Sequence, residues 1–171
     1  MLQRREGGVD EVIIREVKAE DVRRAAEIAV AAWTPIYELR RQTMGEKLFA
    51  ALHRDWKKRK AGQIVAACSP KSGRIVRVAE RNGHVVGFIT FTVDKETGVG
   101  EIGNNAVDPQ SQGMGIGGKM YQVALDEMRK HGIRFVQVST GGDQSHAPAR
   151  RAYERAGFNI QLPSVTYYRK L

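Results

Sequence analysis

Four glycines fall within six residues, Gly113 to Gly118, directly before a run of residues with helical apolar spacing. Glycine lets backbone N–H groups converge on one point because no Cβ stands in the way. A helix that follows adds its unpaired first-turn N–H groups and the positive end of its dipole. The segment therefore predicts a cradle for an anionic ligand, with a phosphate group as the natural occupant.

Three other interpretations of these glycines are weaker. Gly113, Gly115 and Gly118 match the dinucleotide pattern G-x-G-x-x-G, but that pattern needs its first glycine directly after a strand and an acid about 20 residues on. Here residues 108–112 intervene, and the next predicted strand closes on Ser139-Thr140 without an acid. The Walker pattern fails because no Lys-Ser or Lys-Thr pair follows the glycines. A turn that only caps a helix would not require so many glycines.

The residues around this loop resemble the GNAT superfamily of N-acetyltransferases. Gln112-x-x-Gly115-x-Gly117, after Val107-Asp108-Pro109, is similar to that family's coenzyme A pyrophosphate loop, Q/R-x-x-G-x-G/A. Downstream, residues 146–158 resemble a second family motif that ends in Y-E-x-x-G-F. The likeness covers residues 75–158. It implies an α/β (α+β) fold with a mixed, mostly antiparallel twisted sheet, one parallel splayed strand pair and about four flanking helices.

Residue patterns predict the first half of such a fold without the resemblance. A β-branched strand at residues 12–17 precedes an apolar helical stripe over residues 22–33, which Pro35 should end. A weaker stripe of Phe49, Leu52 and Trp56 predicts a second helix. Its far side carries a cluster of cations that we expect to be solvated: Arg54, Lys57, Lys58, Arg59 and Lys60.

The second half should contain most of the sheet. Asn82-Gly83 is a strong hairpin signal between strands at residues 75–79 and 85–91, and a third strand should run to Val107. Gly103 in that strand suggests a bulge or a close backbone approach. After the loop, a helix ending near His131-Gly132 and a strand at 133–139 form a crossover, so this strand should lie parallel to the one before the loop. A last helix and two closing strands should follow, at 149–156, 158–160 and 165–168.

The resemblance implies how acetyl-CoA would be held. Backbone N–H groups along the loop would bind the diphosphate, with help from the Lys119 side chain. N–H groups of Ala106 and Val107 would polarise the thioester carbonyl. His146 stands where the family usually has an asparagine near the pantetheine. The loop residues concerned are Gln112, Gly113, Met114, Gly115, Ile116, Gly117 and Gly118.

Glu101 aligns with a general base that some family members carry, and Glu80 is the second candidate. An amine with a pKa of about 10.4 is mostly protonated at pH 7, and an ordinary glutamate at about 4.3 is a poor match. Burial must raise the pKa of Glu101, or a water chain must relay the proton. A plain salt bridge is an equally good interpretation of Glu101. Tyr153 aligns with the family's general acid, with a core tyrosine as the alternative.

Trp33, Tyr37 and Tyr167 are candidates for the acceptor pocket, with ordinary core aromatics as the alternative. The acceptor amine itself is not readable from the sequence. An excess of 28 Lys and Arg over 19 Asp and Glu gives a net charge of +9, which favours anionic partners. The resemblance implies acetyl-CoA and an amine, from a small molecule or a protein. No pattern supports a nucleic-acid interface or a membrane span. A homodimer remains an open alternative.

We therefore expect a single domain over residues 1–171, with residues 1–10 flexible, in the cytoplasm. The first residues lack the apolar core of a signal peptide, and the single Cys68 excludes an internal disulfide. No metal site is expected because the histidines lie on separate predicted elements. The leading hypothesis is an N-acetyltransferase that works by direct transfer in a ternary complex. Its alternative is a GNAT-fold module that binds acyl-CoA without turnover.

Overall fold

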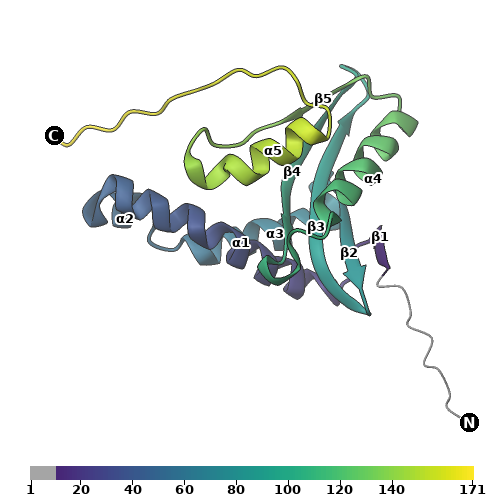
Figure 1. The fold of residues 1–171 in the computed structure, drawn as a ribbon, viewed down its shortest axis with the longest axis horizontal. Coiled ribbons are helices and arrows are strands. Elements are labelled where there is room, and N and C mark those ends of the chain that lie inside the picture. The colour runs from purple at the N-terminus through teal and green to yellow at the C-terminus, as the bar shows by residue number, and fades with distance from the viewer. Residues whose placement is uncertain (1–10) are drawn as a thin grey trace, which may run out of the picture.

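A computed structural model describes residues 11–171, which form one five-stranded sheet with helices on both faces (Figure 1). The strand order is β1-β2-β3-β4-β5, with antiparallel neighbours up to β4 and a parallel β4–β5 pair. This confirms the predicted mixed sheet with one parallel pair. The strands are β1 Val12–Glu16, β2 Ile75–Arg81, β3 His84–Asp94, β4 Val99–Val107 and β5 Phe135–Val138.

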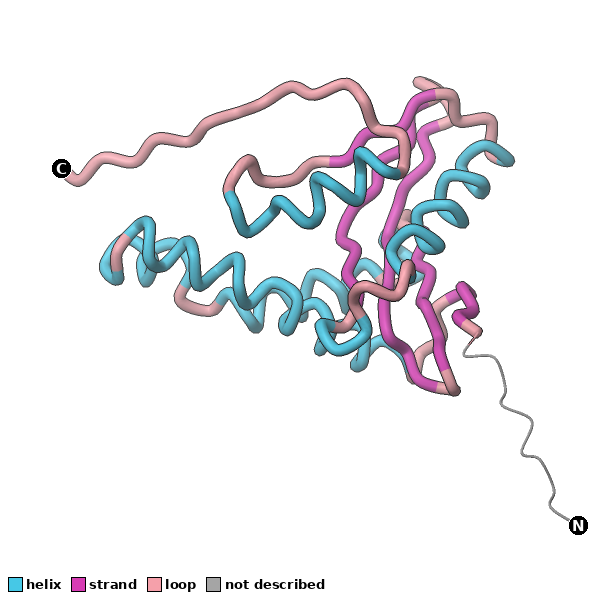
Figure 2. The backbone as a smooth tube through the Cα atoms, in the orientation of Figure 1, coloured by secondary structure: helices cyan, strands magenta, loops and turns pink. Residues whose placement is uncertain are grey.

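Five α-helices flank the sheet: α1 Asp21–Met44, α2 Glu46–His53, α3 Trp56–Ala67, α4 Ile116–Lys130 and α5 Ala147–Arg155. One core cluster joins the sheet to α4, around Phe91, Met120 and Met128. A second joins the opposite face to α1 and α3, around Ile28 and Ile64. The sheet is therefore buried on both faces, and each face has its own helix layer (Figure 2).

The turns follow the predicted glycine signals. Asn82 and Gly83 both have positive φ, 53° and 76°, as the tight β2–β3 hairpin requires. Helix α4 ends before Gly132, whose φ of 80° supplies the left-handed position after the helix. Short 3₁₀ turns at Pro70–Ser72, Pro109–Ser111 and Gln144–His146 complete the connections.

Strand β4 carries one extra residue beside Thr90 of β3. Ile89 pairs with Asn105 and Phe91 with Ile102, so two steps in β3 match three in β4. Gly103 sits in this bulge, and a Cβ there would lie 2.6 Å from Thr90 Oγ1. The predicted bulge is confirmed. It places two consecutive residues, Gly103 and Asn104, on the face that α1 and α3 cover.

Helix α1 does not end at Pro35, so that prediction was wrong. The helix continues to Met44 with the proline inside it. The ring removes one backbone hydrogen bond, but the later turns gain aromatic contacts. Tyr37 stacks on Trp56 with ring centroids 4.1 Å apart, and the Arg41 guanidinium lies 4.7 Å from the Phe49 ring. The second predicted helix is in turn divided into α2 and α3.

The two closing strands are also absent from the described structure, because residues 158–160 and 165–168 pair with no strand. The segment beyond α5 leaves the sheet as an extended chain (Figure 1). Its apolar side chains stay in solvent, with Ile160 88% and Leu162 94% exposed. None of the helices described in residues 11–171 is long and apolar enough to cross a membrane.

Candidate active site

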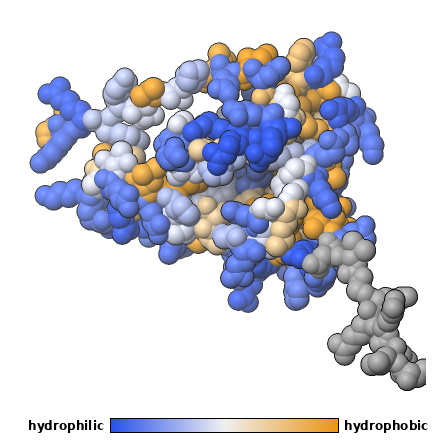
Figure 3. All heavy atoms as spheres, in the orientation of Figure 1, coloured by the Kyte–Doolittle hydropathy of each residue, from blue (hydrophilic) through white to orange (hydrophobic). Residues whose placement is uncertain are grey.

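A cleft with a volume of about 950 Å³ opens where β4 and β5 part. Their pairing ends at Ile102 and Val138, while β4 runs on to Val107. The glycine loop, α1, α3 and α5 close the cleft around the second half of β4. Figure 3 shows the surface hollowed between the hydrophilic side of α5 and α1. The splayed strands predicted from the resemblance thus form its floor.

The glycine loop at one end of this cleft fits a phosphate group. Gly113 and Gly115 have φ of 80° and 74°, and a Cβ on either one, or on Gly118, would meet nothing within 4 Å. No side chain caps the start of α4, so its first-turn N–H groups remain available. Gly113, Gly115, Ile116, Gly117 and Gly118 all line the cleft. Open space and convergent donors are what a diphosphate requires.

Two members of the predicted set lie outside this lining. Met114 is half exposed and its sulfur accepts a hydrogen bond from Arg81. Lys119 is exposed and does not line the cleft. Gln112 does line it, and its Nε2 donates to the Val107 carbonyl at 3.2 Å. The loop entry is fixed by Asp108, whose N–H donates to the Val86 carbonyl.

Strand alternation decides which N–H of the predicted pair faces the cleft. The Asp108 N–H points at β3, where it reaches the Val86 carbonyl at 2.8 Å. Successive residues of a strand direct their N–H groups to opposite edges, so Ala106 also points at β3. Val107 therefore directs its N–H to the edge that β5 has left, which is the open side of β4. Val107 is the member of the pair placed to polarise a carbonyl in the cleft.

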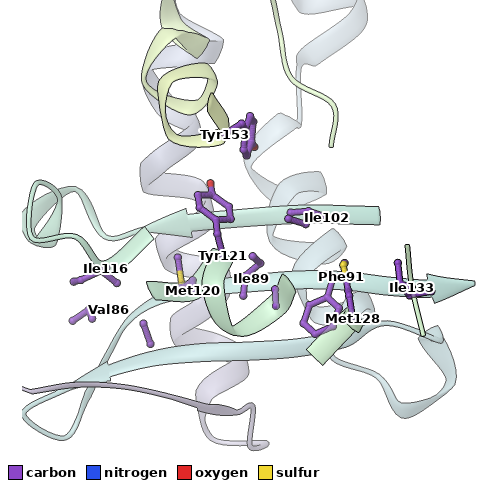
Figure 4. Packing of buried hydrophobic residues seen from close by; sticks show 12 residues of the cluster. Val86, Ile89, Phe91, Ile102, Ile116, Met120, Tyr121, Met128, Ile133 and Tyr153 are labelled. Carbon is purple, nitrogen blue, oxygen red and sulfur yellow. The ribbon is translucent and has the colours of Figure 1, made fainter. Parts of the chain in front are cut away.

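Tyr153 belongs to a buried hydrogen-bond chain that sequence reasoning missed. Its hydroxyl accepts from Asn105 Nδ2 at 3.4 Å, and the Tyr121 hydroxyl donates to Asn105 Oδ1 at 2.7 Å. The Tyr121 and Tyr153 rings meet edge to face at 5.6 Å, and Figure 4 shows the Tyr121 hydroxyl directed toward Tyr153. Burial raises the pKa of Tyr121 above the usual range, so this hydroxyl keeps its proton.

The direction of the hydrogen bonds between Tyr121, Asn105 and Tyr153 follows from the Gly103 carbonyl. Asn105 Nδ2 also donates to the Gly103 carbonyl at 3.0 Å, and a carbonyl can only accept. The other amide atom, Oδ1, must then face Tyr121. Tyr153 consequently receives a hydrogen bond from Asn105 and keeps its own hydroxyl hydrogen. The Tyr121 hydroxyl is a second hydrogen-bonding neighbour of Tyr153, and Tyr153 lines the cleft.

The two candidate bases lie in different places. Glu101 lines the cleft but is exposed, and Gln137 Nε2 donates to it at 3.2 Å. Among the described residues it has no ion pair, so the salt-bridge alternative gains no support. Glu80 does not line the cleft, and Arg15 holds it at 2.6 Å. The structure therefore brings only Glu101 of the two to the site, where its side chain is exposed.

His146 lines the cleft at the start of α5. Its Nδ1 pairs with Asp143 Oδ2 at 2.7 Å, and its side chain is 11% exposed. Burial opposes ionisation of Asp143, but hydrogen bonds from Ser145 and His146 outweigh it and lower the pKa of that carboxyl. The pair fixes the orientation of the ring, which leaves Nε2 as the imidazole atom free of Asp143.

Of the three aromatic candidates for the acceptor pocket, only Trp33 lines the cleft. Tyr37 packs instead among Phe49, His53 and Trp56. Tyr167 is 90% exposed and lies in the C-terminal segment, where it lines a separate groove beside the far end of α1. The described residues hold no group of three or more His, Cys, Asp or Glu side chains that could bind a metal ion.

Lys60 and Arg74 are further cleft residues that sequence reasoning missed. Lys60 was expected on a solvated face, and that prediction was wrong: it is only 8% exposed. It lies on the buried side of α3 with Trp56, Ile64 and Ala67. Its position at i+4 from Trp56 and i−4 from Ile64 is the signal that could have identified it.

The family model described as "Acetyltransferase (GNAT) family" matches residues 33–158. The chain therefore belongs to this family of acetyltransferases. Among curated proteins, a mycothiol acetyltransferase of Thermomonospora curvata is 34% identical over 90 residues, which cover 53% of this chain and 29% of that protein. An IAA acetyltransferase of Azospirillum brasilense is 35% identical over 90 residues, covering 53% of this chain and 58% of that protein. The chain thus spans less than two thirds of either relative.

Solved structures show the same fold at lower identity. PaiA N-acetyltransferase of Thermoplasma acidophilum, solved in complex with coenzyme A, has a TM-score of 0.67 at 20% identity, with 88% of this chain and 91% of that chain covered. The ribosomal-protein-S18-alanine N-acetyltransferase of Escherichia coli has a TM-score of 0.63 at 18% identity, with 89% and 80% covered. Acetyl-CoA is the acetyl donor of this family.

Proposed function

We propose that this protein transfers an acetyl group from acetyl-CoA to a primary amine directly, in a ternary complex. The observation that carries the proposal is the Tyr153 hydroxyl in the cleft. It receives a hydrogen bond from Asn105 and lines the cleft. A module that only binds acyl-CoA needs the glycine cradle but has no use for a positioned proton donor.

Acetyl-CoA would supply an activated acetyl thioester. The backbone N–H groups of Gly115, Ile116 and Gly117 would hold its diphosphate, and the Val107 N–H would stabilise negative charge on the thioester oxygen. Tyr153 would donate its proton to the departing thiolate. His146 would contact the donor through Nε2, in place of the amide that the family usually has there.

Proton removal from the amine is the step for which Glu101 is the candidate. Five residues separate Glu101 from Ala106, which is roughly 13 to 16 Å of extended strand once the bulge is allowed for. Glu101 is therefore too far from an amine that attacks near Val107 to contact it directly. A chain of waters through the cleft is the route that this distance favours, with Glu101 as the final acceptor.

The proposal is tested by mixing the protein with acetyl-CoA and a panel of primary amines while free thiol is measured. Thermal unfolding with acetyl-CoA alone provides the binding readout. We expect a raised melting temperature and amine-dependent thiol release. A raised melting temperature with no release for any amine, and no acetylated product by mass spectrometry, would support the binding module instead.

A further inference from the structure

Two cations, Lys60 and Arg74, line the cleft on the face of β4 that α1 and α3 cover. We call this face the acceptor side. The Lys60 Nζ lies 4.2 Å from the centre of the Trp33 ring and 3.1 Å from Asn104 Oδ1. Arg74 Nη1 lies against Gly103, 2.8 Å from where a Cβ would stand. Neither side chain forms an ion pair with any residue that the structure describes. Buried lysines normally have a partner, because an isolated charge loses its hydration.

The bulge in β4 brings these two cations together. Gly103 and Asn104 are consecutive residues, yet both lie on the face covered by α1 and α3, so Arg74 and Lys60 approach the same side of the strand. Glu101, two residues before Gly103, shares this face and is the only acidic residue among the described residues that line the cleft. The acceptor side therefore holds two cations, at Gly103 and Asn104, and one carboxylate two residues earlier in the same strand.

This charge pattern argues against a simple cationic acceptor. An alkyl ammonium ion placed near Lys60 and Arg74 would be repelled, at an energy that grows as water is excluded. An acceptor that also carries a negative group would pair with both cations. Helix α3 begins at Trp56, four residues before Lys60, so its first-turn N–H groups are not at the Lys60 ammonium to bind the extra oxygens of a phosphate. Two cations match the two oxygens of a carboxylate.

We propose, on the basis of the acetyltransferase function proposed above, that Lys60 and Arg74 bind a carboxylate of the acceptor. The acceptor class is then a small molecule with both a primary amine and a carboxylate, as in amino acids. Trp33 forms the apolar wall beside this group and holds the Lys60 ammonium through its ring face. The acceptor amine would lie on the Val107 side of the two cations, and Glu101 would receive its proton through the waters of the cleft.

The pKa of Lys60 makes the proposed carboxylate site dependent on pH. Burial, with a smaller contribution from Arg40, lowers the pKa of Lys60 to about 8. A bound carboxylate would reverse this shift, because a nearby opposite charge favours the ammonium form. Carboxylate binding should therefore be coupled to proton uptake near pH 8.

The main test compares amino acids with their matched amides, such as alanine with alaninamide, as acceptors at saturating acetyl-CoA. We expect kcat/KM about 10- to 100-fold higher for the acids, the range for one hydrogen bond to a charged group. Lys60→Met should remove this preference through the acceptor KM and leave the KM for acetyl-CoA unchanged. Lys57→Met is the matched control, because Lys57 is an exposed lysine of the same helix, 5.7 Å from the Trp56 ring.

Three results would overturn the proposal. Equal rates with amino acids and their amides would show that the site does not recognise a carboxylate on the acceptor. An equal loss for every acceptor in Lys60→Met would place Lys60 in proton transfer, and a raised KM for acetyl-CoA would assign the cations to the donor. These outcomes leave the acetyltransferase function intact.

A binding measurement separates the two proposals if no amine is acetylated. In a Trp56→Phe background, Trp33 is the only tryptophan and reports on Lys60 through fluorescence. Propionate should change this signal saturably, propionamide should not, and Lys60→Met should abolish the response. That result would support the carboxylate site in the absence of catalysis. No difference between propionate and propionamide would overturn it.

Discussion

Replacing Tyr153 by Phe should reduce the rate far more than the stability. The hydroxyl receives a long hydrogen bond of 3.4 Å from Asn105 Nδ2, and that amide keeps its shorter bond to Gly103. The loss in unfolding free energy should stay below about 1 kcal/mol. General-acid catalysis contributes about 10²- to 10⁴-fold, or roughly 3 to 5 kcal/mol of barrier. The deficit should therefore appear in kcat while folding survives.

Tyr121→Phe is the matched control because it removes the other hydroxyl of the same chain. Tyr121 donates to Asn105 Oδ1 at 2.7 Å and is only 5% exposed. Its loss leaves a buried acceptor unpaired, at a cost of about 1 to 3 kcal/mol. We expect a melting temperature lower by several degrees, since each kcal/mol shifts a domain of this size by about 2 to 4 °C. The fall in kcat should be the smaller of the two.

The assay follows thiol release for both variants with acetyl-CoA and with an acyl donor whose leaving thiol has a low pKa. A weakly basic thiolate hardly needs a proton, so the parent and Tyr153→Phe should converge on the activated donor. The reasoning is refuted if Tyr153→Phe loses equally with both donors, or loses nothing with acetyl-CoA. Tyr153 would then be a packing residue between Tyr121 and Phe158.

Three further changes test other parts of the site. Gly115→Val should abolish the rise in melting temperature with acetyl-CoA, whereas Gly132→Val, with a similar φ of 80° away from the cleft, should be destabilised but keep the rise. Glu101→Gln should lower kcat/KM and flatten its increase with pH, leaving acetyl-CoA binding intact; an unchanged pH profile would remove Glu101 as the base. Lys60→Met should stabilise the ligand-free protein by up to about 3 kcal/mol near pH 7, because burial and a smaller contribution from Arg40 lower the pKa of Lys60 to about 8 from 10.5 and each unit corresponds to about 1.4 kcal/mol. The unfolded state binds more protons between these values, so the parent should recover stability as the pH rises through that window, measured by urea unfolding.

The features that could be predicted are those whose signal lies in neighbouring residues. Asn82-Gly83 specifies a tight hairpin through backbone conformation alone, and the strand–glycine–helix order before β5 requires a parallel crossover. The glycine cradle is equally local, because its geometry depends on missing side chains. These local signals predict the fold and the end of the cleft that would bind acetyl-CoA.

The features that could not be predicted depend on contacts distant in sequence. Pro35 is a helix breaker by local chemistry, but Tyr37 and Trp56 hold the later turns of α1 in place. Residues 165–168 alternate like a strand, yet nothing local says which edge would pair with them. The sequence could not identify Asn105 as the residue that orients Tyr153, because this role depends on α4 and α5 placing Tyr121 and Tyr153 beside it.

The single extra residue in β4 links the two ends of the proposed reaction. In a regular strand, successive side chains alternate between faces, so Gly103 and Asn105 would share one face and Asn104 would take the other. The bulge shifts this alternation: Asn104 turns to Lys60 on the α3 side, while Asn105 turns to Tyr121 on the α4 side. Adjacent asparagines therefore contact the two residues that we propose for acceptor binding and proton donation, Lys60 and Tyr153.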